Sequence, residues 1–106
     1  MAWQILYYVR PNGRSPYNDW FGDLDSTIQN YVATALDRMA EYEQLGDCRL
    51  ILGGEGLRER RLHARGGWRL YFVQECDRII LFCGGKKEDQ TRDIGRAKGY
   101  LAEYRG

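Results

Sequence analysis

Histidine is almost absent from this sequence: His63 is the single one among 106 residues. A nuclease site built from two histidines is therefore excluded. The cysteines Cys48, Cys76 and Cys83 are odd in number and lack the spacing of metal ligands, and the carboxylates form no such cluster either. We predict no metal and no cofactor, and we expect reduced thiols, as is usual in a cytoplasm.

Long apolar runs are missing as well. The run Ile79–Cys83 is far too short to span a membrane. Met1–Gln4 lacks the basic region and the apolar core of an export signal, so we expect a cytoplasmic protein with no membrane partner. A chain of 106 residues has no room for two cores, so residues 1–106 are predicted to form one domain.

The net charge of +1 conceals an asymmetry between the two halves of the chain. Residues 1–57 hold four Lys and Arg against eight Asp and Glu, whereas residues 58–106 hold twelve against seven. A basic half of this kind suits a polyanionic partner, nucleic acid first. A solvated, charged surface without such a partner is the alternative.

The first half of the chain predicts a strand and two helices. Trp3–Arg10 is an almost continuous apolar run, which suits a strand that is central or covered on both faces. Ser15 then caps a short helix whose first turn contains proline. A second helix follows the cap signal at Asp25 and should run to about Leu45, with Gly46 as its left-handed stop.

The second half predicts two consecutive hairpins. Residues 49–56 should form a connector with Leu50 and Leu52 pointing inward. The strands are then predicted over Leu57–Ala64, Trp68–Gln74 and Arg78–Cys83, with turns at residues 65–67 and 75–77. Gly84-Gly85 permits a tight exit from the sheet.

A last helix should begin near Glu88-Asp89 and carry the apolar stripe Ile94, Ala97, Leu101 and Tyr104. The element order predicts an α+β fold: a strand, two helices, an antiparallel sheet of about four strands and a C-terminal helix. We expect the two consecutive helices to pack on one face of the sheet and to leave the other face open.

The first hairpin has a testable register. A three-residue turn at residues 65–67 would place Ala64 opposite Trp68 and Leu62 opposite Leu70. The apolar residues would then face the helices, and the residues on the open face would be Arg61, His63, Arg69 and Tyr71. Arg60 falls on the apolar face, so we expect it near the sheet edge or with its head group reaching water.

Cationic and polar side chains gather on this open face and just beyond the last strand: Arg58, Arg61, Arg69, Tyr71, Lys86, Lys87 and Gln90. Guanidinium groups bind phosphates in a forked geometry, and lysine supplies a point charge. Cleavage of RNA requires a base for the 2′-hydroxyl, charge at the phosphate and an acid for the leaving oxygen. The alternative is a face of solvated arginines paired with Glu59 and its neighbours. His63 is either an accessory donor beside Arg69 or a plain surface residue.

Several short motifs in order resemble one protein family. They are Glu59-Arg60-Arg61-Leu62, Gly67-Trp68-Arg69-Leu70-Tyr71-Phe72, Leu81-Phe82-Cys83-Gly84-Gly85-Lys86-Lys87 and residues 90–98, together with Ser15-Pro16 and Asp19-Trp20-Phe21 earlier. Over residues 15–100 the chain resembles the addiction-module killer branch of the RelE/ParE toxin superfamily. This HigB-like group is related to phage-derived proteins.

The resemblance implies a RelE-like α+β fold and a bacterial type II toxin that is neutralised by an antitoxin, often a helix-turn-helix protein. It also implies metal-independent endoribonuclease cleavage of mRNA, commonly on the ribosome. Arg61, Arg69 and Lys87 would then be the catalytic residues, with Lys87, alone or with Lys86, as the base or electrostatic stabiliser.

The residues implied to bind nucleic acid are Arg58, Tyr71, Lys86 and Gln90, and Glu59 would orient Arg61. Two positions depart from the family pattern: Arg60 replaces an apolar residue, and Lys86 replaces an aspartate found in many members. Two other functions stay open, a non-enzymatic gyrase poison of the ParE kind and an inactive or regulatory member of the family.

Overall fold

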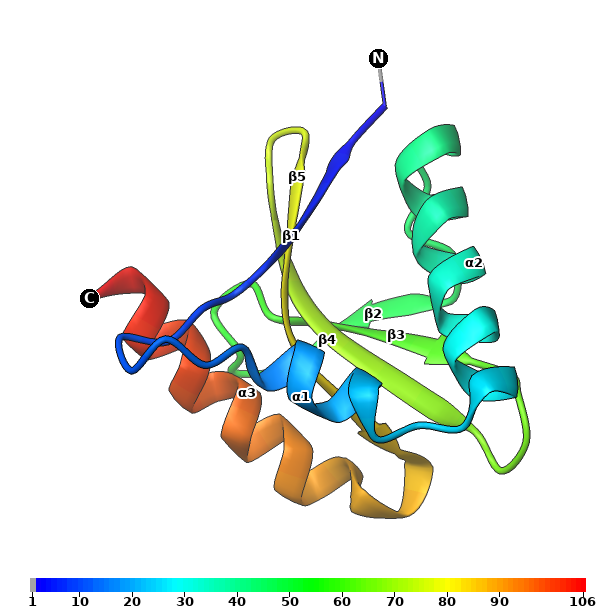
Figure 1. The fold of residues 1–106 in the computed structure, drawn as a ribbon. Coiled ribbons are helices and arrows are strands. Elements are labelled where there is room, and N and C mark those ends of the chain that lie inside the picture. The colour runs from blue at the N-terminus through cyan, green and yellow to red at the C-terminus, as the bar shows by residue number, and fades with distance from the viewer. Residues whose placement is uncertain (1) are drawn as a thin grey trace.

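The computed structural model describes residues 2–106 and shows the element order that the sequence predicts, namely a strand, two helices, strands and a C-terminal helix (Figure 1). The elements are β1 (Gln4–Tyr7), α1 (Pro16–Gly22), α2 (Ser26–Tyr42), β2 (Cys48–Leu50), β3 (Arg58–Leu62), β4 (Trp68–Glu75), β5 (Arg78–Lys86), the 3-10 turn η1 (Lys87–Asp89) and α3 (Gln90–Arg105). The fold is α+β.

The sheet has five strands in the order β1-β5-β4-β3-β2, and it is mixed rather than wholly antiparallel. The strand β1 lies at one edge and pairs parallel with β5, with Gln4 opposite Arg78. The prediction of a central or doubly covered first strand is therefore wrong, and Leu6 and Tyr7 are exposed. The apolar run overstated burial because these side chains lie at a sheet edge.

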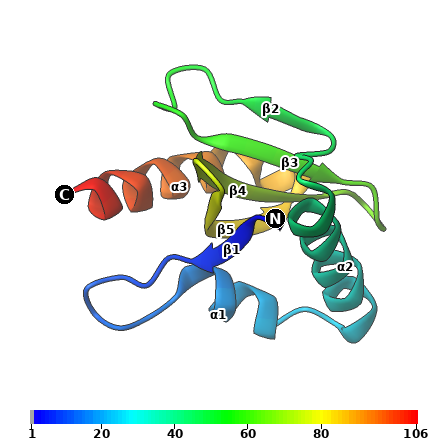
Figure 2. The same cartoon turned by 90° about the horizontal axis from the view of Figure 1, so that it is seen from above.

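Helices cover both faces of the sheet (Figure 1 and Figure 2). On one face α1 and α2 pack through residues such as Tyr17, Val32 and Met39 against Leu70 and Phe72. On the other face α3 packs its predicted stripe against the sheet, in a second cluster that includes Tyr71, Val73, Phe82, Ala97 and Leu101. The expected open face is therefore wrong, because the C-terminal helix returns across it and buries residues such as Tyr71 and Phe82.

The caps at the start of the first two helices are confirmed. Oγ of Ser15 accepts a hydrogen bond from the backbone of Asn18, and Oδ1 of Asp25 accepts one from Ile28. The end of α2 differs from the prediction, because Tyr42 is its last residue and Glu43 adopts the left-handed conformation at φ 51°. Gly46 instead lies against the guanidinium of Arg60, which occupies the space that a β-carbon would need.

The connector after α2 contains a short edge strand. Leu50 and Leu52 are exposed, the latter to 95%, so the prediction that they point inward is wrong. Ile51 and Leu57 are buried in their place. Pairing of β2 with β3 sets this alternation, because successive side chains on a strand point to opposite faces.

The hairpin of β3 and β4 differs from the predicted register by two residues. Leu62 pairs with Trp68 and Arg61 pairs with Arg69, so residues 63–67 form a longer loop than expected. Gly66 and Gly67 both have positive φ in this loop. A shift of two residues preserves the side-chain faces, so the predicted separation of apolar and cationic faces is confirmed although the pairing is wrong.

Gly84 and Gly85 lie inside β5 and do not form an exit from the sheet. A β-carbon on Gly84 would collide with the ring of Trp20, and one on Gly85 would collide with the carboxylate of Asp93. The two glycines therefore allow α1 and α3 to approach the strand closely from opposite sides. Within residues 2–106, no helix combines the length and apolarity needed to cross a bilayer.

Candidate functional site

Three predicted catalytic residues line one pocket. Arg61 on β3 and Arg69 on β4 are direct partners across the ladder. Together with Lys87 they line a pocket of about 400 Å³, whose other lining residues are Leu62, His63, Ala64, Gly66 and Gly67. We call it the cationic pocket. The pocket is open to solvent.

Lys87 reaches this pocket because the start of η1 is joined to the loop between β3 and β4. The backbone N–H of Lys87 donates a hydrogen bond to the carbonyl of Gly67 at 3.2 Å. A β-carbon added to Gly67 would be 3.5 Å from Cβ of Lys87, so the lysine stem lies against the glycine backbone. This backbone contact brings Lys87 close to Arg61 and Arg69, from which it is distant in the sequence.

The two arginines have unused hydrogen-bonding capacity. Nε of Arg61 and Nε of Arg69 are both buried and have no hydrogen-bond partner in the structure. The side chain of Arg69 is only 12% exposed, whereas that of Arg61 is 42% exposed. Because a buried donor without an acceptor costs about 1–3 kcal/mol, this arrangement favours an anionic ligand with several oxygen atoms, such as a phosphate.

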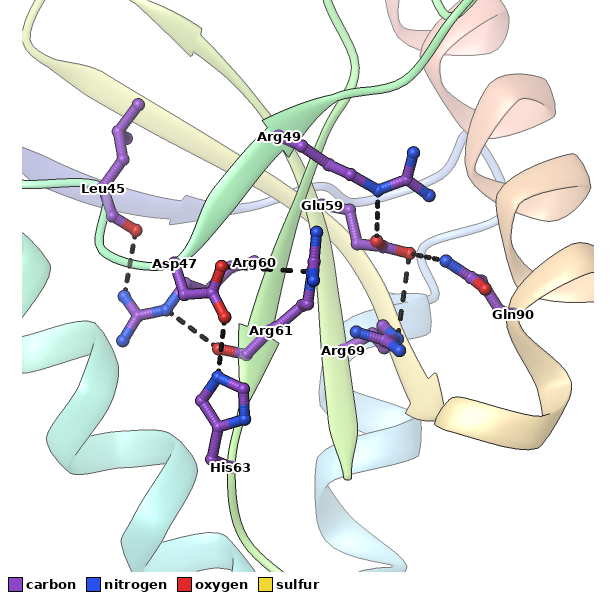
Figure 3. Close-up of polar contacts among 9 residues, drawn as sticks. All are labelled: Leu45, Asp47, Arg49, Glu59, Arg60, Arg61, His63, Arg69 and Gln90. Carbon is purple, nitrogen blue, oxygen red and sulfur yellow. Dashed lines mark hydrogen bonds and ion pairs between the residues drawn. The ribbon is translucent and has the colours of Figure 1, made fainter. Parts of the chain in front are cut away.

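Two carboxylates partly offset this positive charge, and both are shared (Figure 3). Oδ1 of Asp47 lies 3.9 Å from Nε of Arg61, and Oε2 of Glu59 lies 4.0 Å from Nε of Arg69. Neither distance is short enough for a hydrogen bond. Each carboxylate also has closer partners, so neither arginine has its positive charge fully neutralised.

Glu59 is the most densely paired of these carboxylates and is fully buried. It accepts hydrogen bonds from Nε of Arg49 at 2.9 Å and from Nε2 of Gln90 at 2.8 Å (Figure 3). Burial by itself would raise the pKa of Glu59, but these hydrogen bonds and the charges of Arg49 and Arg69 bring it below its ordinary value. Glu59 therefore stays ionised and holds Arg49, Arg69 and Gln90, not Arg61 as expected.

Asp47 pairs instead with Arg61 and His63 (Figure 3). Nε2 of His63 lies 2.6 Å from Oδ2 of Asp47, and this hydrogen bond, with the nearby charge of Arg61, lowers the pKa of Asp47. His63 is 72% exposed and lines the cationic pocket. The histidine is therefore on the surface, as expected, but it is oriented by a carboxylate beside the candidate phosphate site.

Tyr71 and Gln90 do not face the solvent in the way that direct binding of RNA requires. Tyr71 is fully buried beneath α3, so its ring offers no face to a base. Its hydroxyl has no hydrogen-bond partner, and burial together with the negative charge of Glu59 raises its pKa. Gln90 is engaged with Glu59 at the start of α3. Neither residue is among those that line the cationic pocket.

Arg58 and Lys86 lie on the face opposite the cationic pocket. Arg58 pairs with Phe72, which belongs to the core beneath α1 and α2. Lys86 pairs with Trp68, and its Nζ lies 5.9 Å from the centre of that ring. Lys86 is still part of β5, so only Lys87 among the two lysines joins Arg61 and Arg69. The predicted grouping of all these cations on one surface is wrong, because neighbouring strand residues alternate between faces.

Arg60 meets the expectation for a charge on an apolar face. Its stem crosses towards α2, where its guanidinium donates hydrogen bonds to the carbonyl of Leu45 at 3.0 Å and to its neighbour Arg61 at 3.2 Å (Figure 3). These bonds join the loop after α2 to β3. Arg60 therefore has a structural contact and does not enter the cationic pocket.

Asp47 and Arg49 are site residues that sequence reasoning missed. Both belong to the segment around β2, which was expected to be a connector without pairing. Arg49 pairs with Glu59 across the ladder of β2 and β3. Opposite charges are favourable at such positions, so recognition of Cys48–Leu50 as a strand was the signal that could have found this pair.

Metal-ligating groups are not clustered in the part of the chain that the structure describes, where no set of three or more His, Cys, Asp or Glu is arranged to hold an ion. The three cysteines at residues 48, 76 and 83 are all free. The polar chemistry of the cationic pocket thus comes from guanidinium, ammonium, imidazole and carboxylate groups.

No protein-family model matches this chain. An uncharacterized protein of Haemophilus influenzae is 28% identical to it over 83 residues, which are 77% of this chain and 82% of that protein. The similarity extends over most of both chains, and it assigns no activity.

Proposed function

We propose that this protein is the toxin component of a bacterial type II toxin-antitoxin module, a HigB-like member of the RelE/ParE superfamily that cleaves mRNA without a metal. One observation carries the proposal: Arg61, Arg69 and Lys87 line a single pocket. The Nε atoms of the two arginines are buried and have no hydrogen-bond partner. These groups suit a phosphodiester whose negative charge increases during cleavage.

In this mechanism the scissile phosphate lies between the two arginines, which neutralise its oxygens. The 2′-oxygen attacks phosphorus, the bond from phosphorus to the 5′-oxygen breaks, and the products are a 2′,3′-cyclic phosphate and a 5′-hydroxyl. Lys87 acts as the base that takes the 2′-hydroxyl proton, or it acts as a stabilising charge while solvent water takes that proton. His63, oriented by Asp47 at 2.6 Å, is available to supply a proton to the leaving oxygen.

The proposed partners are mRNA, the ribosome and a cognate antitoxin of the helix-turn-helix kind. The basic second half of the chain supports a polyanionic partner, because twelve of its residues are Lys or Arg and seven are Asp or Glu. The antitoxin and the ribosome rest on the resemblance to HigB-like toxins. The open position of the cationic pocket is compatible with either one covering it.

Expression of the protein without an antitoxin tests the proposal. Growth should stop and transcripts should be cut. Arg61→Ala, Arg69→Ala and Lys87→Ala should each reduce cleavage by roughly 100-fold or more, the usual loss when one stabiliser of transition-state charge is removed. Lys98→Ala is the matched control, because Lys98 is exposed on α3 and is not among the residues lining the pocket.

The same experiment separates the other candidate functions. Arrested growth with intact transcripts would contradict the nuclease. A DNA-damage response with continuing translation would indicate a gyrase poison, which needs neither Lys87 nor Tyr71. Harmless expression of folded protein would indicate an inactive or regulatory member of the family.

A further inference from the structure

A second cavity, of about 520 Å³, lies at the end of β5 and is lined by residues of both α1 and α3. Two tryptophans, three basic and three acidic residues line it, and we call it the tryptophan cavity. Its lining includes Trp20, Trp68, Lys86, Arg92, Arg96 and Asp89. Among its lining residues the resemblance assigns a role to Lys86, and neither the resemblance nor the mechanism above assigns a role to the tryptophans.

Trp68 contacts two other residues that line this cavity. Its ring is tilted by 55° to that of Trp20, with their centres 6.2 Å apart, and Nζ of Lys86 lies 5.9 Å from its centre. The indole N–H of Trp68 is buried and has no hydrogen-bond partner. An aromatic ring whose neighbours are a second indole and a flexible lysine suits a planar ligand that can replace the lysine.

Neighbouring residues at one end of the sheet line the two cavities. Trp68 and Lys86 are paired and line the tryptophan cavity, whereas their chain neighbours Gly67 and Lys87 line the cationic pocket. Successive residues of a strand point to opposite faces, so the end of the ladder separates the two cavities. A single strand of nucleic acid can therefore pass over this end and contact both.

Arg92 and Arg96 in the tryptophan cavity already have acidic partners, which distinguishes it from a phosphate site. Arg92 lies 3.4 Å from Asp89 and 3.4 Å from Asp93, and Arg96 lies 3.7 Å from Asp93. Lys86 is bound to the tryptophan ring instead. The cavity thus offers an aromatic surface and balanced polar groups, which match the uncharged face and polar edge of a nucleobase.

We infer that the tryptophan cavity binds a nucleobase of the single-stranded RNA whose phosphodiester occupies the cationic pocket. The base stacks on Trp68 and displaces the ammonium of Lys86 towards the RNA backbone. This inference rests on the proposed function. It adds that substrate selection depends on a base beside the cut as well as on the phosphate.

Photo-crosslinking of the wild-type protein tests this inference without any risk of misfolding. The probe is a 2′-O-methyl RNA, which cannot be cleaved through its 2′-hydroxyl, carrying 4-thiouridine at one position at a time. Mass spectrometry should locate a crosslink on Trp68 or Lys86 for one position. Crosslinks that map only to other residues would overturn the nucleobase site and leave RNA binding intact.

Variants at Trp68 give the quantitative test. Trp68→Leu should weaken binding of the same RNA by about 5- to 150-fold, the loss expected for one stacked base, whereas Trp68→Phe should retain most of the affinity because it keeps a ring. Lys98→Ala serves as the control for general charge. Equal affinities for Trp68→Leu and the wild type would refute the nucleobase site.

The nucleobase site and the nuclease function can be refuted separately. If the wild type binds and cuts RNA but Trp68→Leu does the same equally well, only the nucleobase site is refuted. If the wild type binds no RNA and yields no crosslink anywhere, the proposed nuclease function is refuted and the nucleobase site with it. Thermal unfolding of each variant confirms that a loss of binding is measured on folded protein.

Discussion

Glu59 accepts a hydrogen bond from Gln90 at 2.8 Å and thereby joins the middle of β3 to the first residue of α3. The same carboxylate holds Arg49 at 2.9 Å and faces Arg69 at 4.0 Å. One buried acidic side chain thus connects the helix that covers the sheet with an arginine of the cationic pocket. Stability and the geometry of the pocket should therefore depend on the same residue.

Replacement of Glu59 should destabilise the protein in a pH-dependent way. Glu59→Gln keeps the shape but removes the charge, and we expect a loss on the order of 3 kcal/mol at neutral pH, because charged partners are left without their acceptor. The pKa of Glu59 is lowered in the folded state, so its stabilisation is present above the unfolded pKa and is lost as pH falls through the folded pKa.

Urea unfolding of the wild type and Glu59→Gln between neutral and acidic pH measures this difference. The two curves should converge as the pH falls. Glu41→Gln is the control, since Glu41 is exposed on α2 and this change removes a carboxylate without touching the network. A difference in unfolding free energy between the wild type and Glu59→Gln that stays the same at all pH values would contradict this explanation.

Asp93 should show the opposite trend with pH. Burial raises the pKa of Asp93 despite the nearby charges of Arg92 and Arg96, and its Oδ2 has no hydrogen-bond partner. The folded state therefore favours the protonated carboxyl. Its contribution to stability is fully present below the unfolded pKa and is lost as pH rises through the folded pKa.

Asp93→Asn should consequently be at least as stable as the wild type at neutral pH, with the advantage disappearing in acid. Unfolding midpoints of both proteins over the same pH series provide the measurement. A variant that is less stable than the wild type at neutral pH and recovers in acid would show that the ion pairs with Arg92 and Arg96 outweigh burial.

Gly85→Ala should disturb the contact between β5 and α3. The added β-carbon would occupy the position of the Asp93 carboxylate, so the helix or the side chain must move. We expect a loss of about 1–3 kcal/mol, as for other overpacked sites. Gly99→Ala is the matched control within α3, because nothing lies within 4 Å of its added carbon, and it should stabilise the helix by up to about 1 kcal/mol. Chemical denaturation of the two variants compares them, and equal stabilities would contradict the close contact.

Asp47→Asn should strengthen RNA binding by the cationic pocket. Asp47 contributes a negative charge 3.9 Å from Nε of Arg61 and holds His63. Removal of this charge should tighten binding by about fivefold, the effect of one unit charge about 4 Å from another in water. Fluorescence anisotropy with a non-cleavable RNA, at two salt concentrations, gives the measurement. Unchanged affinity would show that RNA does not contact Arg61.

The same variant should slow cleavage once RNA is bound. Without the carboxylate, the imidazole of His63 loses the partner that orients it, and a general acid or base usually contributes at least about 100-fold to the rate. Single-turnover cleavage with saturating protein separates this effect from binding. A rate equal to that of the wild type would assign His63 to the surface alone, without a role in proton transfer.

The sequence by itself determined the local features of this protein. The caps at Ser15 and Asp25, and the apolar stripe of the last helix, follow from contacts within one or two helical turns. Alternation along the strands assigned Arg61 and Arg69 to one face and Leu62 to the other. This assignment survived a two-residue error in register, because the period of a strand is two.

Only the tertiary structure determined which elements pack on each face of the sheet. The return of α3 across the sheet buries Tyr71 and places Gln90 on Glu59, and the parallel pairing of β1 with β5 puts an apolar run at the edge. The turn after β5 sends Lys86 and Lys87 to opposite sides. These outcomes depend on contacts between residues far apart in the chain, whose energies no local pattern contains, and they determine which cations share a pocket.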